Sequence, residues 1–261
     1  MRKGVDIVVL NHVSPNRLKQ FLKSLYETGS SRPFDLWVAS VEPRTDHSFV
    51  IEGSRGHHVI HRDHGIGSIV NSTVFLGFRE NIVIFDANIE LTPGCLDICL
   101  DILDSDPKIG VVGPRLVTPT GLVVSAGFFG DPPEERSGSS SDSSETRDIR
   151  DASHVSGYAY FIKRKVWWEA FSFMRNLNIW TKLRQENLIP VDVPDGAFLP
   201  TYRDYEALSC SLLVRKMDYR CVYFGSSEVV YHGSTTKPNT DRDLSGSKIV
   251  FEEFKQAAQL N

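Results

Sequence analysis

No stretch of the sequence approaches the roughly 18 consecutive apolar residues of a membrane-spanning helix, so no transmembrane segment is predicted. Residues 1–4 lead directly into strand-like sequence, which predicts no signal peptide. Neither sign of charge dominates, because the formal net charge is only −4, and this mild acidity gives no support for a nucleic-acid-binding surface. Together these absences lead us to expect a cytoplasmic protein.

Cysteine is scarce, with four residues in a chain of 261: Cys95, Cys99, Cys210 and Cys221. Cys95 and Cys99 stand four positions apart on one face of an expected helix, which is not the spacing of a zinc knuckle. We therefore expect buried, unpaired thiols in a reducing compartment, rather than a disulfide or a metal site.

The apolar fraction of 41% is ample for the core of one large domain, which we place at residues 1–236, followed by a helical tail at 237–261. Residues 131–151 differ from the rest, because they are rich in Ser and charged side chains. Such a composition buries too little apolar area to offset the chain entropy, so we expect a flexible loop there. It is either a lid over a site or a solvated insertion.

Strand-like and helix-like segments alternate through the first hundred residues, which predicts a parallel, doubly wound sheet flanked by helices. Apolar, β-branched runs mark the strands, and Ser-Pro or Thr-Pro pairs mark two helix starts, with Thr92 as N-cap and Pro93 as the first helical residue. The expected strands include residues 5–10, 34–39, 57–61, 82–85, 110–113, 154–162, 220–223 and 228–231, and the expected helices include 68–77, 92–105, 204–216 and 249–260.

The strand at residues 82–85 is followed at once by two polar side chains, Asp86 and Asn88. In open α/β sheets, ligands bind at the carboxyl ends of the strands, so these oxygen atoms lie where a hard cation can use them. The alternative is that Asp86 and Asn88 only shape a polar turn. This stretch alone does not decide between the two.

Five segments in one order resemble the inverting glycosyltransferases of family 2, which have the GT-A fold. The resemblance covers roughly residues 5–128 and 153–236. The segment at 84–91 resembles the metal-binding Asp-x-Asp motif of that family, and Val-Tyr-His-Gly-Ser at 230–234 resembles its closing motif. The other three are residues 5–25, residues 64–67 with Asn71, and residues 106–115.

The resemblance implies a GT-A fold with a nucleotide-binding half at about residues 1–113 and a smaller, mixed acceptor-side half at about 114–236. It implies a nucleoside-diphosphate sugar as donor, most simply a UDP-sugar, and Mn²⁺ or Mg²⁺ as cofactor. The implied metal ligands are Asp86, Asn88 and His232, and an imidazole suits Mn²⁺ better than Mg²⁺. The residues implied to border the nucleotide are Asn11, Ser40, Asp63, Gly65, Gly67, Asn71, Asp86 and Ala87.

The chain departs from the family pattern at three places. Asn88 stands at the second acidic position of the metal motif, which lowers the ligand charge. Ala39 and Ser40 follow Val38 where the family has an aspartate that holds the base, so the nucleotide is open. Ala207 replaces the second acid of a Glu-Asp pair.

Inversion needs a carboxylate that accepts the proton of the attacking acceptor hydroxyl. By resemblance this general base is Glu206 or Asp204, which the sequence does not separate. The alternative is that both are only acids favoured by the positive end of a helix dipole.

Two other functions compete with a glycosyltransferase. A non-catalytic nucleotide-sugar-binding protein would account for Asn88 and Ala207. A nucleotidyltransferase ranks lower, because it requires a Gly-rich segment with Arg or Lys near the N-terminus, and residues 11–14 offer none. The acceptor is open among saccharides, proteins, modified nucleic acids, lipid-linked sugars and small molecules, and so is the oligomeric state.

Overall fold

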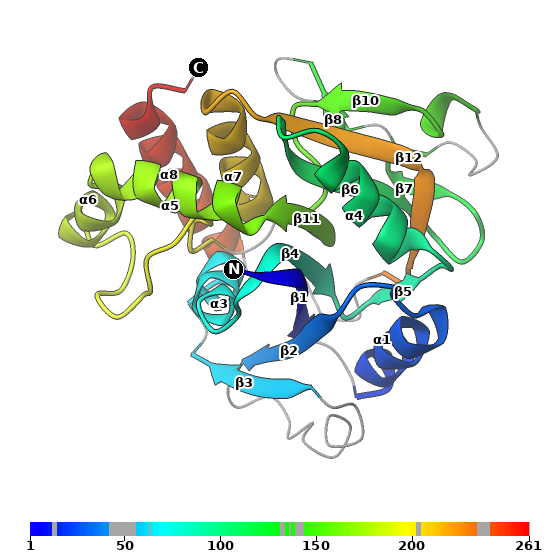
Figure 1. Ribbon diagram of the computed structural model, residues 1–261. Helices are drawn as coiled ribbons and strands as arrows, with labels where there is room; N and C mark the ends of the chain where they lie inside the picture. The colour runs from blue at the N-terminus through cyan, green and yellow to red at the C-terminus, as the bar shows by residue number, and fades with distance from the viewer. Residues whose placement is uncertain are drawn as a thin grey trace.

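The computed structural model describes most of the chain, with short gaps (Figure 1). The described residues are 1–11, 15–41, 56–62, 64–130, 134–135, 137–138, 144–201, 205–233 and 241–260. Asp63 and Asp204 therefore lie outside the described residues.

A ten-stranded sheet runs through the molecule in the order β10-β12-β6-β11-β4-β1-β2-β3, with β5 beside β12 and β7 beside β6. One half is parallel throughout, because β3, β2, β1 and β4 pair parallel in turn. The other half is mixed, since β11 is antiparallel to both β4 and β6. The strands are β1 (Arg2–Asn11), β2 (Phe34–Val41), β3 (His57–His61), β4 (Arg79–Asp86), β5 (Ile89–Leu91), β6 (Ile109–Val117), β7 (Val123–Ser125), β10 (Ile149–Ala152), β11 (Ala159–Lys163) and β12 (Arg220–Tyr231), and a separate pair is β8 (Phe128–Phe129) with β9 (Glu134–Glu135).

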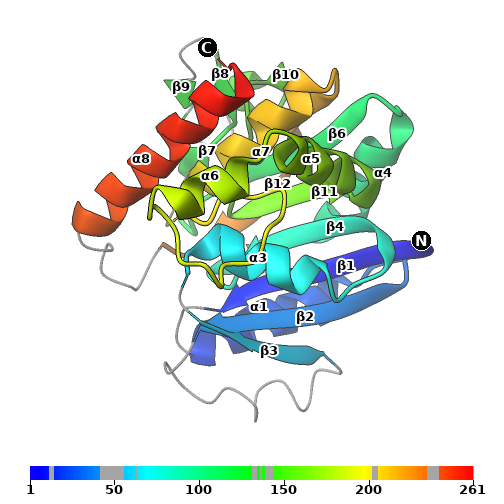
Figure 2. The same ribbon diagram turned by 90° about the vertical axis from the view of Figure 1, so that its left-hand side faces the viewer.

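Helices cover both faces of the sheet, which confirms the predicted fold class (Figures 1 and 2). On β4, Ile82 and Ile84 belong to one buried cluster and Val83 and Phe85 to the other, because successive side chains of a strand point to opposite faces. One face carries α1 (Pro15–Thr28) and α4 (Cys95–Ser105), and the other carries α3 (Ile66–Val74), α5 (Arg164–Asn176), α6 (Ile179–Gln185), α7 (Tyr205–Lys216) and α8 (Asp241–Ala258).

The start predicted for the helix after β5 is wrong. Helix α4 begins at Cys95, and Gly94, with φ of 77°, is its N-cap in place of Thr92. The Thr92 hydroxyl instead donates to the carbonyl oxygen of Glu228 on β12, at 2.5 Å. A tertiary hydrogen bond thus removes the capping group that the local sequence offers.

Other boundaries also differ from the sequence prediction. The strand expected at 154–162 begins only at Ala159, and the helix expected at 249–260 begins at Asp241. The two strands expected at 220–223 and 228–231 form one strand, β12, with a register shift between Phe224 and Glu228. The described residues of the expected 131–151 loop include β9, a 3₁₀ helix at Ser144–Thr146 and β10, which pairs with β12. The end of that loop is therefore an edge of the sheet.

The tail expected after residue 236 forms part of the hydrophobic core. Helix α8 is 18 residues long and contributes Phe251 and Phe254 to the buried cluster shared with α6 and α7.

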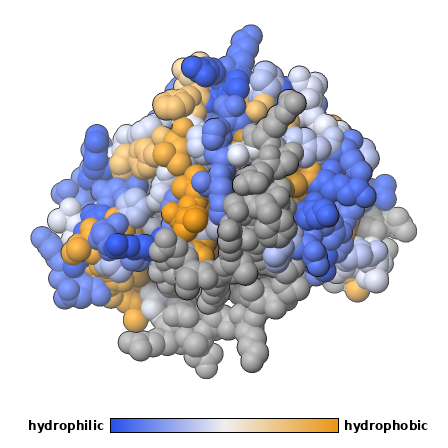
Figure 3. Space-filling view, turned by 90° about the horizontal axis from the view of Figure 1, so that it is seen from below, coloured by the Kyte–Doolittle hydropathy of each residue, from blue (hydrophilic) through white to orange (hydrophobic). Residues whose placement is uncertain are grey.

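On the face seen from below in Figure 1, hydrophilic residues border a smaller group of hydrophobic ones (Figure 3). The surface is thus mixed on that side rather than uniformly polar.

A buried ion pair ties β1 to α5 at the amino ends of the parallel strands. Arg164 Nη2 donates to Asp6 Oδ2 at 2.5 Å, and the two side chains are 3% and 1% exposed. Asp6 also accepts hydrogen bonds from Trp37 Nε1 at 3.0 Å and from the Arg79 amide at 2.8 Å. Burial lowers the pKa of Arg164, which the neighbouring carboxylate opposes.

Replacing Asp6 with Ala is expected to lower the free energy of unfolding by about 3–5 kcal/mol, because the Arg164 guanidinium stays buried without its carboxylate. Urea unfolding followed by circular dichroism measures this change. Glu27→Ala, which removes an exposed pair with Lys23, serves as the control and should cost no more than about 1 kcal/mol. An Asp6 variant as stable as the control would contradict the prediction.

Candidate functional site

The candidate site begins where β4 ends. Asp86, its last residue, is 4% exposed, and Asn88, two residues on, is 1% exposed. The Asn88 amide donates to Asp86 Oδ1 at 2.7 Å, which fixes the turn between β4 and β5. The polar turn allowed by the sequence is thus present, and it holds a carboxylate and a side-chain amide close together.

Strand β5 then brings a distant segment to this turn. Ile89 pairs with Tyr231 of β12 in antiparallel register, and the His232 amide donates to the Asn88 carbonyl oxygen at 3.0 Å. Residues directly opposite each other in an antiparallel pair project to the same face. The side chains of Asn88 and His232 therefore project to one face, and the Asn88 backbone is bonded to Asp86 on one side and to His232 on the other.

The side chain of Asn88 is the least satisfied polar group of this cluster. Among the described residues, neither its Oδ1 nor its Nδ2 has a hydrogen-bond partner, although both atoms are buried. A buried polar group without a partner costs about 1–3 kcal/mol. Such groups in a folded protein call for an explanation, and one is a ligand or ion that binds there.

The imidazole of His232 is held by side chains from two other elements. Its Nε2 lies 2.8 Å from Glu90 Oε2, on β5, and 3.2 Å from Gln20 Nε2, on α1. Gln20 Nε2 also donates to Glu90 Oε2 at 2.7 Å. Glu90 and Gln20 were not among the site residues predicted from the sequence. The alternation of side chains along β5 places Glu90 on the same face as Asn88, and this signal could have identified Glu90.

Glu206 borders the same region from the opposite half of the sheet. It lies in the first turn of α7 and is 8% exposed. A Cβ atom added at Gly157 would lie 3.1 Å from Glu206 Oε1, so the carboxylate packs against this glycine. The next residue, Tyr158, accepts a hydrogen bond from the Asp86 amide at 3.0 Å. One short segment thus separates the two carboxylates that the sequence singled out.

Polar groups form a row at the carboxyl ends of β1 and β2. Asn11 and Ser40 are register partners, and Asn11 Nδ2 donates to Ser40 Oγ at 2.9 Å. His58 Nε2, from β3, lies 2.9 Å from the same hydroxyl. His58 was not among the predicted site residues, because the pattern of a short strand does not show which of its side chains faces a ligand. Ala87 is a buried core residue, and its amide bonds to Leu10.

The Gly65-Ile66-Gly67 segment packs closely against other backbone, which the sequence did not indicate. A Cβ at Gly67 would lie 1.7 Å from the Leu199 carbonyl oxygen, and Gly65 has φ of 89°. Asn71 is fully buried and bonds to both the amide and the carbonyl of Phe198. In this conformation Asn71 anchors the chain near Phe198 and does not face open space.

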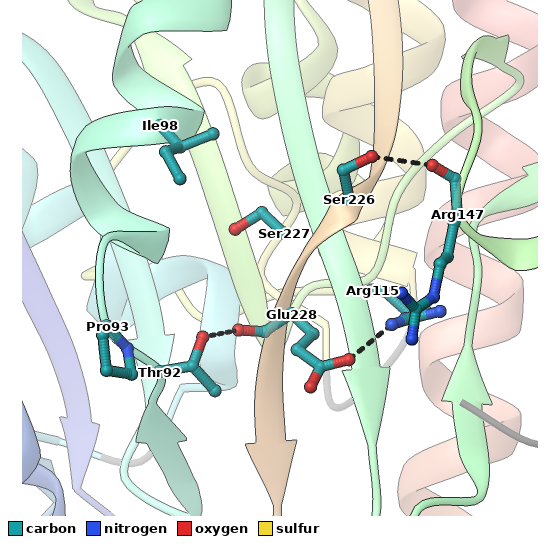
Figure 4. Close-up of a pocket in the computed structure, with 8 residues that line it drawn as sticks. All are labelled: Thr92, Pro93, Ile98, Arg115, Arg147, Ser226, Ser227 and Glu228. Carbon is teal, nitrogen blue, oxygen red and sulfur yellow. Dashed lines mark hydrogen bonds and ion pairs between the residues drawn. The ribbon is translucent and has the colours of Figure 1, made fainter. Parts of the chain in front are cut away.

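A cavity lies beyond Thr92, between the start of α4 and β12 (Figure 4). An ion pair crosses it, with Arg115 Nη2 2.5 Å from Glu228 Oε2, and Arg115 is also bonded to Thr146. The lining residues are Thr92, Pro93, Ile98, Arg115, Arg147, Ser226, Ser227 and Glu228. Both signs of charge occur in it, so it lacks the character of a dedicated anion or cation site.

The four cysteines are free and buried, as predicted. Burial raises the pKa values of Cys210 and Cys221 to about 12, so neither is a thiolate at neutral pH. Among the described residues, no group of three or more His, Cys, Asp and Glu side chains is arranged to hold a metal ion. A metal site at Asp86 therefore depends on the amide of Asn88.

The half-parallel, half-mixed sheet flanked by helices is a GT-A fold. Two solved structures share it over nearly the whole chain. A mannosyltransferase of Pyrobaculum calidifontis, in complex with GDP-Man and Mn²⁺, is 14% identical, with 98% of this chain and 74% of that chain covered and a TM-score of 0.57. Glucosyl-3-phosphoglycerate synthase of Mycobacterium tuberculosis, with Mn²⁺, UDP-Glc and phosphoglyceric acid, is 9% identical, with 99% and 81% covered and a TM-score of 0.56.

A third structure, GalNAc-T7 with UDP, GalNAc and Mn²⁺, is 11% identical with a TM-score of 0.67. The match covers 96% of this chain and 48% of GalNAc-T7. No protein-family profile and no curated protein sequence matches the chain. Within its described part, the chain has no helix that is long and apolar enough to cross a bilayer.

Proposed function

We propose that the protein is a metal-dependent, inverting glycosyltransferase that moves a sugar from a nucleoside diphosphate to an acceptor hydroxyl. The observation that carries this proposal is the chain of hydrogen bonds that links Asp86, Asn88 and His232 at one end of the sheet. Glu206 packs against Gly157, and the carbonyl of the next residue, Tyr158, accepts a hydrogen bond from the Asp86 amide. The proposal is supported by the GT-A fold and by the Mn²⁺ and nucleotide ligands in the three solved structures.

The donor set fits a divalent cation. Asp86 would supply a carboxylate oxygen, Asn88 its otherwise unpartnered amide oxygen and His232 an imidazole nitrogen, a mixture that suits Mn²⁺. Only three protein ligands are needed, because a diphosphate and water complete the shell. A cation held there would stabilise the negative charge that develops on the departing diphosphate.

Glu206 is the general base in this proposal. Its carboxylate would accept the proton from the acceptor hydroxyl while the hydroxyl oxygen attacks the anomeric carbon and the bond to the diphosphate breaks. The configuration inverts, because attack and departure take place on opposite faces of the sugar. Asp204 remains the alternative base.

The nucleotide would lie along the polar row of Asn11, Ser40 and His58, at the carboxyl ends of β1 and β2. UDP is the proposed nucleotide; it occurs as UDP or UDP-Glc in two of the three solved structures, and GDP-Man occurs in the other. Ala87, Gly65 and Asp63 are further residues that we propose to border the nucleotide. A cytoplasmic location remains part of the proposal.

A panel of UDP-, GDP- and TDP-sugars, incubated with the protein and Mn²⁺, tests the proposed activity. We expect the nucleoside diphosphate to be released from sugars of one of the three nucleotides, and we expect this release to stop when EDTA removes the metal. UDP-sugars are expected to be the active series. A folded protein that binds no donor and releases no diphosphate from any of them would contradict the proposal.

A second candidate function is binding of a nucleotide-sugar without turnover. Asn88 and Ala207 favour it, since each replaces an acid of the family pattern. Calorimetry with the same donors separates the two functions. Donor binding with no diphosphate release, unchanged in Glu206→Gln and Asp204→Asn variants, would favour the binding protein.

A further inference from the structure

The hydrogen bonds around His232 assign its tautomer. Glu90 Oε2 lies 2.8 Å from Nε2 of the imidazole. An ionised carboxylate only accepts hydrogen bonds, so Nε2 carries the hydrogen of this contact. Gln20 Nε2 lies 3.2 Å from the same ring atom, but it is also a donor, and it donates to Glu90 Oε2 at 2.7 Å. The two N–H groups thus share one carboxylate oxygen, and the longer Gln20–His232 approach is not a hydrogen bond. The lone pair of the neutral ring is then on Nδ1, which has no hydrogen-bond partner among the described residues.

We propose that Glu90 is a positioning residue that fixes His232 in the Nε2–H tautomer, so that His232 binds the divalent cation through Nδ1. This inference rests on the proposed function. A carboxylate that accepts the second N–H of a metal-binding histidine orients the ring and raises its basicity. Glu90 itself would not contact the metal or the sugar.

The position of Glu90 is fixed by its strand and by a neighbouring helix. The pairing of Glu90 with Val230 puts its side chain on the face of β5 and β12 that carries Asn88 and His232. From α1, Gln20 Nε2 donates to Glu90 Oε2 at 2.7 Å. Arg17 in turn donates to Gln20 Oε1 at 2.9 Å.

This arrangement couples a helix, a strand and the end of β12. Glu90 and His232 are 142 positions apart in the chain and meet only through the pairing of β5 with β12. Glu90 is 40% exposed in its side chain while the His232 side chain is 14% exposed, so the carboxylate forms the outer side of the pair. Replacement of Glu90 is therefore less disruptive to the core than replacement of a fully buried acid.

The test uses Glu90→Leu, which removes the acceptor and keeps the bulk, and Glu90→Gln, which keeps an acceptor oxygen without the charge. Long-range ¹H–¹⁵N NMR of the metal-free protein reads the His232 tautomer directly. The wild type is expected to be in the Nε2–H form, Glu90→Leu in a mixture and Glu90→Gln close to the wild type.

Mn²⁺ affinity is the second readout, measured by titration calorimetry in the presence of UDP. Loss of a group that supports a metal ligand typically weakens metal binding about 10–100-fold, which is the expected effect of Glu90→Leu. Glu90→Gln should recover part of this affinity, and His232→Ala should lose at least as much as Glu90→Leu. Glu80→Leu, at the other end of β4, is the matched control and should leave Mn²⁺ affinity unchanged.

The outcomes separate this inference from the function on which it rests. If Glu90→Leu keeps both the tautomer and the Mn²⁺ affinity while His232→Ala loses affinity, the positioning role is overturned and the metal site stands. If the wild type binds no Mn²⁺, both are overturned. The inference is supported if Glu90→Leu changes the tautomer and weakens Mn²⁺ binding while Glu80→Leu does neither.

Discussion

A Glu206→Gln variant is expected to turn over about 10²–10⁴ times more slowly than the wild type, with donor binding unchanged. The amide is nearly the same size as the carboxylate, so it keeps the packing against Gly157 but cannot accept the proton of the acceptor hydroxyl. The measurement is kcat for transfer, or for diphosphate release with water as acceptor, together with donor affinity by calorimetry.

The matched variant is Asp204→Asn, two positions earlier in the sequence. If Glu206 is the base, Asp204→Asn should retain turnover within a few-fold of the wild type. The reverse pattern, with turnover lost in Asp204→Asn and kept in Glu206→Gln, would assign the base to Asp204. Full turnover in both variants would contradict a general base at either position.

An Asp86→Asn variant should bind Mn²⁺ at least about 100-fold more weakly, since losing even an indirect supporting group costs about 10–100-fold. Asp86 is the only carboxylate among the proposed ligands, and ligand charge helps to set the affinity for a divalent cation. The substitution keeps an oxygen that can accept the hydrogen bond from the Asn88 amide, so the turn should survive. Calorimetry with Mn²⁺ and UDP measures the loss, and diphosphate release should fall with it.

The reciprocal change, Asn88→Asp, is the informative companion to Asp86→Asn. It restores a second carboxylate to the motif and should tighten Mn²⁺ binding. Unchanged Mn²⁺ affinity in Asp86→Asn, with an intact fold by circular dichroism, would exclude Asp86 as a ligand. Unchanged affinity in both variants would place the metal, if one is bound, elsewhere.

Much of the fold followed from local pattern. The apolar run at residues 82–85 lies within β4, and the alternation of strands and amphipathic helices gave the parallel half of the sheet correctly. Helix and strand ends were less accurate, because they depend on distant partners. Thr92 illustrates this, since its hydroxyl bonds to β12 instead of capping α4.

For the site too, the residues at strand ends were predictable from local sequence, whereas the contacts between distant segments were not. That Asp86 and Asn88 follow a buried strand could be read from the sequence, because the residues that end a strand are set by the strand itself. The contact of His232 with Glu90 and Gln20 could not, because it joins segments far apart in the chain. The resemblance to a family named His232 but not the residues that hold it.

The sequence by itself determined which residues form the strands of the nucleotide-binding half and which polar groups stand at their ends, because both follow from local hydrophobic periodicity. Only the tertiary structure decided what these groups face. The pairing of β5 with β12 brings the His232 amide to the Asn88 carbonyl. The packing of Glu206 against Gly157 places it beside the segment whose next residue, Tyr158, bonds to the Asp86 amide. The sequence also did not indicate that Gly67 lies against the backbone of Leu199, since a glycine permits close approach of any neighbour and does not specify which.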